Sequence, residues 1–129
     1  MAFSNYLEDQ ITGWINGSTF ASAPTSTFVQ LYSQDPTDAG SATGALYTRV
    51  AVAAGGWTRG TGGAGTLTNT AAITITSSAA SGATATHVAV FDTITGGNML
   101  FAGSLASSKT IATGDEVKFN ASALTLTVA

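Results

Sequence analysis

The sequence predicts a mainly β protein, an antiparallel β-sandwich or jelly roll with one N-terminal amphipathic helix. Seven or eight short runs of β-branched and aromatic residues are separated by turn residues. Two of these runs, at 88–91 and 99–102, are apolar in succession, which indicates strands covered on both faces. Helical periodicity is confined to the beginning of the chain. At 129 residues we expect a single domain, 1–129, with a helix at 4–16 and a β-sandwich at 27–128.

The predicted helix carries an apolar stripe whose members follow the spacing i, i+4, i+7 and i+8: Leu7, Ile11, Trp14 and Ile15. Ser4 or Asn5 is suited to cap its first turn, and Asn16-Gly17 is suited to end it. The stripe must pack either on the sheet of its own subunit or on a neighbouring protein. We expect the stripe to pack on the sheet of its own subunit.

The first two strands are expected at 27–33 and 47–53, separated by a loop that an Asp-Pro turn introduces. Arg49 stands among apolar residues of the second strand. An arginine in that position is expected to pair with a nearby carboxylate, Asp35 or Asp38, rather than to take part in chemistry.

Residues 54–66 are dense in glycine and predict a mobile, exposed loop. Three glycines match the spacing of a GxGxxG motif: Gly60, Gly62 and Gly65. A dinucleotide site needs a helix after that motif, whereas a strand-like segment follows here, so the match does not predict phosphate binding. Trp57 and Arg59 in this loop are candidates for a protein contact, because these residue types are enriched at interfaces.

The second half of the chain contains the remaining expected elements. They are, in order, a strand at 72–76 with Ile73 and Ile75 inward, a loop at 77–82, a central hairpin within 86–103, a short strand at 109–112, a turn at 114–115, a strand at 116–119 and a final strand at 124–128. Gly96-Gly97-Asn98 supplies the positive-φ residues that the hairpin turn requires.

Composition argues against several classes of protein. Without cysteine the chain has neither disulfides nor thiolate metal sites. Four permanent cations cannot form a basic stripe, so we expect no nucleic-acid binding. No signal-peptide pattern and no apolar run approaching ~20 residues occurs, so we expect no membrane association and synthesis in the host cytoplasm.

No catalytic arrangement is expected, and no cofactor or metal site. His87 is the single histidine and stands in an apolar strand, which favours a hydrogen-bonded core or interface residue. Asp92, five residues later, falls on the opposite face of a strand. Asp35 and Asp38 belong to a turn, where carboxylates usually accept hydrogen bonds from their own backbone.

Several segments resemble a family of small phage virion proteins, often labelled phage tail fibre or minor tail proteins. The similar segments are Leu-Tyr at 31–32, Asp-Pro-Thr-Asp-Ala-Gly at 35–40, Tyr-Thr-Arg-Val-Ala-Val at 47–52, Thr-His-Val at 86–88, Phe-Asp at 91–92, Gly-Gly-Asn-Met-Leu at 96–100, Ala-Gly at 102–103, and the tail containing Ile111, Gly114-Asp115, Phe119 and 123–126. The N-terminal helix before Pro24 also fits. The resemblance implies a virion structural protein.

The charged fraction, 9%, is far below the ~25% of ordinary globular proteins, which indicates that much of the surface faces protein partners. A compositional bias of the host is the alternative explanation. We expect a non-enzymatic virion protein, and our leading hypothesis is a capsid decoration or cement protein that stabilises the head, because the chain has neither fibrous repeats nor heptads. The first alternative is a tail fibre or minor tail protein. A carbohydrate-binding module, with Trp57, Tyr47 and Tyr32 stacking on sugars, is more remote.

The expected partners are other copies of the chain, in a homotrimer, and a neighbouring virion protein such as the major capsid protein. Broad areas of small residues can approach a partner with little loss of side-chain entropy. The residues expected to make these contacts are Trp57, Arg59 and Trp14.

Overall fold

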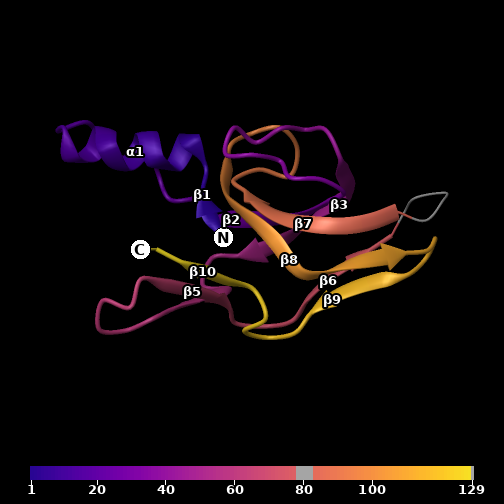
Figure 1. The fold of residues 1–129 in the computed structure, drawn as a ribbon. Helices are drawn as coiled ribbons and strands as arrows, with labels where there is room; N and C mark the ends of the chain where they lie inside the picture. The colour runs from indigo at the N-terminus through magenta and orange to yellow at the C-terminus, as the bar shows by residue number, and fades with distance from the viewer. Residues whose placement is uncertain (78–82, 129) are drawn as a thin grey trace.

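The computed structural model describes residues 1–77 and 83–128 and shows two layers of antiparallel strands with one helix projecting from them (Figure 1). The elements are β1 (Ala2–Phe3), α1 (Asn5–Ile15), β2 (Ser26–Tyr32), β3 (Ala45–Ala53), β4 (Trp57–Arg59), β5 (Thr66–Asn69), β6 (Ile73–Thr76), β7 (Ala83–Phe91), β8 (Met99–Ile111), β9 (Glu116–Phe119) and β10 (Thr125–Thr127). The mainly β, antiparallel fold with one N-terminal helix is thus confirmed.

One layer is a five-stranded sheet in the order β1-β8-β7-β2-β3. The other consists of a three-stranded sheet, β10-β5-β4, and a two-stranded sheet, β6-β9. The main core lies between the layers, where side chains of β2, β7 and β8 meet those of the smaller sheets. Ile73 and Ile75 of β6 are buried in it, as their alternation with threonine predicts.

The hairpin of β7 and β8 is central, as expected. Val88 and Val90 of β7 belong to the main core, whereas Ala89 and Phe91 belong to a second apolar cluster with Tyr32 and other residues on the outer face of the sheet. Both faces of β7 are therefore covered. The hairpin turn contains Gly96 at φ 59° and Gly97 at φ 68°, which confirms the positive-φ conformations predicted there.

The loop between β2 and β3 covers the outer cluster. Pro36 in this loop is buried, and a Cβ atom placed on Gly40 would lie 3.1 Å from Cβ of Met99. Asp35 accepts a hydrogen bond from the backbone N–H of Thr37 at 2.9 Å, so this carboxylate holds its own turn as predicted.

A bulge interrupts the pairing of β2 with β3. Val29 pairs with Val50 but Leu31 pairs with Leu46, so β3 contains two more residues than β2 in this interval. Tyr47 adopts φ 64° there. The buried side chain of Gln30 fills the bulge and donates from Nε2 to the carbonyl oxygens of Leu46 at 2.6 Å and Tyr47 at 3.0 Å.

Arg49 does not pair with Asp35 or Asp38, and that prediction is wrong. Its Nη1 donates to the carbonyl oxygens of Thr93 and Gly96 at 2.8 Å each, and Cζ lies 3.5 Å from the centroid of the Phe91 ring. Burial lowers the pKa of Arg49, and Tyr32 and Asp92 partly oppose that shift. The arginine thus ties β3 to the turn of the central hairpin, a contact that depends on strand order.

Two predicted boundaries differ from the structure. The strand expected at 109–112 is the end of β8, because the first residues of β7 extend far enough to pair with 109–111. The segment expected as a loop at 54–66 contains β4, which pairs with β5 to form a hairpin. The strands at 72–76, 116–119 and 124–128 are confirmed by β6, β9 and β10. Of the loop expected at 77–82, all but Ser77 lies outside the described residues.

Helix α1 begins as expected, with Ser4 as the N-cap whose Oγ accepts a hydrogen bond from the N–H of Leu7 at 3.2 Å. The expectation that its stripe packs on its own sheet is wrong for the second half of the helix. Leu7 is half-buried, but Trp14 is 63% exposed and Ile15 is 74% exposed. The physical reason is that β1 and Ser4 attach only the first turn to β8, and the helix then runs away from the sandwich (Figure 1).

Candidate functional site

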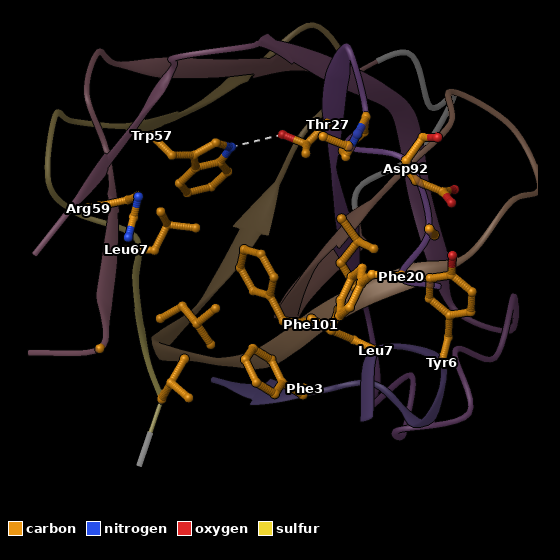
Figure 2. A pocket seen from close by; sticks show the side chains of 18 of the residues that line it. Phe3, Tyr6, Leu7, Phe20, Thr27, Trp57, Arg59, Leu67, Asp92 and Phe101 are labelled. Atoms are coloured by element: carbon orange, nitrogen blue, oxygen red, sulfur yellow. Dashed lines mark hydrogen bonds between the residues drawn. The ribbon is translucent and has the colours of Figure 1, made fainter. Parts of the chain in front are cut away.

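An open apolar pocket of about 580 Å³ lies between the N-terminal arm, residues 1–24, and one edge of the sandwich. The arm contributes β1, the first turn of α1 and the segment 20–24. The sandwich contributes the β4-β5 hairpin, the beginning of β8, the residues after β7, and β10. Figure 2 shows aromatic and aliphatic side chains from these elements pointing toward a common space.

Trp57 forms part of one wall and is held in place by two contacts. Its indole Nε1 donates to Oγ1 of Thr27 at 2.8 Å, the bond drawn in Figure 2. Its ring meets that of Phe101 edge to face, with centroids 5.8 Å apart. Phe101 in turn pairs with Phe3 across the β1-β8 ladder. These contacts make a preformed aromatic surface.

The arm is fastened at two points. Ser4 Oγ donates to the carbonyl oxygen of Met99, and the N–H of Asn5 donates to the carbonyl oxygen of Asp38 at 2.9 Å. In the segment that follows the helix, the N–H of Ala21 donates a hydrogen bond to Oε1 of Gln10 in the helix at 2.9 Å. This bond folds the segment 20–24 back along the helix. Phe20 is thereby brought to the pocket, where it remains 40% exposed.

Two charged residues line the pocket on different walls. Arg59 belongs to β4 and is exposed. Asp92 follows β7 and accepts hydrogen bonds from the N–H of Asn98 at 2.7 Å and from Nδ2 of Asn98 at 3.0 Å. The carboxylate therefore holds the hairpin turn, whereas Arg59 lies beside Leu67 in Figure 2.

The structure brings together two of the three residues predicted to contact partners. Trp57 and Arg59 lie two positions apart on β4 and line the same pocket, whereas Trp14 lies near the far end of α1. Trp57 is half-buried and hydrogen-bonded, not carried on a mobile loop. The pocket residues Phe3 and Phe20 were not predicted. Phe20 is a large aromatic residue in a segment of small residues, a signal that could have marked it.

The aromatic platform proposed for sugar binding is not present. Tyr32 is 1% exposed in the outer cluster, where burial raises its pKa, and Tyr47 is half-buried in the β2-β3 bulge. Neither lines the pocket that contains Trp57. The three rings named for this platform therefore do not form a common surface.

His87 is half-buried in β7, with Nδ1 2.9 Å from Oγ1 of Thr86. Within residues 1–77 and 83–128, no three histidine or acidic side chains are grouped in a way that could hold a metal ion. No helix in these ranges is both long and apolar enough to cross a bilayer.

Comparison with known families shows that the chain matches a family of phage proteins. The model of the family described as "Podophage GP4 fiber I protein gp80" matches residues 2–127. The match therefore includes the N-terminal arm as well as both layers of the sandwich. No curated protein matches the chain.

Proposed function

Because the chain belongs to the family of the podophage GP4 fiber I protein gp80, a family of phage virion structural proteins, we propose that it is a non-enzymatic component of a tail fibre. The match over residues 2–127 is the observation that carries this proposal. The family description favours the tail-fibre alternative over the capsid-decoration hypothesis.

The architecture supports a role in binding other virion proteins. A two-layer sandwich holds the pocket wall rigidly through Trp57 and Phe101, and the helix presents Trp14 and Ile15 to the outside. Large exposed apolar side chains and a preformed apolar pocket are each typical of protein interaction sites. We propose that the partners are further copies of the chain, in a homotrimer, and a neighbouring virion protein.

Labelling of purified virions with a gold-conjugated antibody against this chain tests the proposal. We expect gold at the tail fibres. An antibody against the major capsid protein of the same virions marks the head for comparison, and particles that lack this chain supply the background. Gold over the head instead of the tail would support the capsid-decoration hypothesis, and gold at neither place would exclude a virion component.

A further inference from the structure

We propose that the end of helix α1 in one copy of the protein occupies the apolar pocket of a neighbouring copy. The inserted residues are Trp14 and Ile15, and the receiving surface is formed by Trp57, Leu67 and Phe101. This contact concerns how copies associate, and it holds wherever in the virion the protein is placed.

The helix end has the properties of an inserted element. Trp14 and Ile15 are the two most exposed large apolar residues among those described. They continue the stripe that begins with Leu7, which already lines the pocket of its own copy. A tryptophan left in water in this way is the residue type that most often dominates an interface.

A helix cannot insert its end into the pocket of its own copy. Leu7 lines that pocket, and Trp14 follows seven residues later, about 10 Å further along the axis of the helix. The helix runs away from the sandwich over this distance (Figure 1). The pocket therefore remains open unless another molecule fills it.

The size and chemistry of the pocket suit this occupant. A volume of about 580 Å³ accommodates two large side chains, and the walls are mainly aromatic and aliphatic. The half-buried ring of Trp57, which the buried Phe101 supports from behind, can receive an indole edge to face or offset, the arrangements that aromatic pairs prefer.

Charge complementarity also favours the end of α1. The C-terminal end of a helix carries a partial negative charge of about 0.5 elementary charge. The last turn of α1 contains no basic residue that would neutralise that end. The acidic side chains of α1, Glu8 and Asp9, lie in the first half of the helix. The pocket wall contributes the exposed guanidinium of Arg59, a cation that can face the carbonyl oxygens of the incoming helix.

A second copy is the occupant that these features favour, because each chain contains both the inserted element and its receiving pocket. A reciprocal pair, or a closed ring in which each helix enters the next copy, fills every pocket and covers every Trp14. A partner of different sequence would have to cover the helix end and the pocket by two separate contacts.

Disulfide cross-linking provides the direct test, since the chain has no cysteine of its own. One batch carries Ile15→Cys and a second, differently tagged batch carries Val128→Cys, a pocket residue that is 45% exposed. After mixing and mild oxidation we expect a disulfide between the two tagged chains. The matched control replaces Val128→Cys by Lys118→Cys, an exposed position outside this pocket, and should give little product. Equal yields from both pairs would overturn the proposal.

Sedimentation equilibrium supplies the second readout. Trp14→Ser should raise the dissociation constant for self-association by about tenfold or more. At a dilution where both proteins are monomeric, their melting temperatures should agree, because the side chain is exposed in the monomer. Ile94→Ser, which removes an exposed apolar side chain outside the pocket, should leave association unchanged. A wild-type protein that is monomeric and gives no cross-link, or an oligomer that Trp14→Ser does not weaken, would overturn the proposal.

Discussion

Replacing Gln30 by leucine should destabilise the protein more than any other change of similar volume in β2. Gln30 is 5% exposed and supplies both hydrogen bonds to the carbonyl oxygens of Leu46 and Tyr47 described above. Its Oε1 also accepts a hydrogen bond from Nε of Arg49 at 3.3 Å. Leucine fills a similar space but offers neither a donor nor an acceptor.

The magnitude follows from the groups left without partners. Each carbonyl oxygen deprived of its donor in a buried site costs about 1–3 kcal/mol. The loss of the bond from Nε of Arg49 adds a smaller free-energy cost, because the guanidinium keeps its two hydrogen bonds to the hairpin turn. The apolar surface that leucine buries offsets part of the loss, so the free energy of unfolding should fall by about 2–4 kcal/mol.

Thermal unfolding followed by circular dichroism measures this loss. For a chain of 129 residues we expect a fall in melting temperature of about 6–20 °C. Gln34→Leu is the matched control, since Gln34 lies in the exposed loop after β2, and it should unfold close to the wild-type temperature. If Gln30→Leu melted within about 2 °C of wild type, the carbonyl oxygens of the bulge would not depend on Gln30 and this reasoning would be refuted.

Four further results are expected. Gly97→Val should lower stability by about 1–2 kcal/mol or more, because φ is 68° and the new Cβ would collide with Thr93; an unchanged denaturant midpoint would contradict this. Ser4→Ala should cost about 1–2 kcal/mol and increase hydrogen exchange in the first turn of α1, since the N-cap and its bond to Met99 are lost; unaltered exchange there would count against the anchoring role. Burial raises the pKa of Tyr32 in the folded state, so its contribution to stability is complete below pH 10.0 and is lost as the pH rises above that value; Tyr32→Phe should flatten the alkaline fall in melting temperature, and an equal fall in both proteins would disprove it. His87→Ala should change stability alone, because among residues 1–77 and 83–128 only Thr86 is hydrogen-bonded to a ring nitrogen of His87; loss of a measurable turnover with the fold intact would overturn the non-enzymatic proposal.

Sequence alone predicts those features that depend on residues close together in the chain. The N-cap at Ser4, the positive φ of Gly96 and Gly97, and the burial of Ile73 and Ile75 follow from local hydrogen bonding, backbone sterics and the twofold period of a strand. The family resemblance also rests on such short segments, and the family match confirms it.

Only the tertiary structure decided what distant segments do to one another. Arg49 contacts the turn after β7 because β2 lies between β3 and β7 in the sheet, an order that no local pattern contains. The ring of Trp57 contacts that of Phe101, which lies 44 positions later in the sequence. They meet because the β4-β5 hairpin and β8 belong to facing layers. The stripe of α1 predicts an apolar contact but not its direction. The attachment of β1 and Ser4 to β8 sends Trp14 away from the sandwich, since the axis of a helix is set where its first turn is fixed.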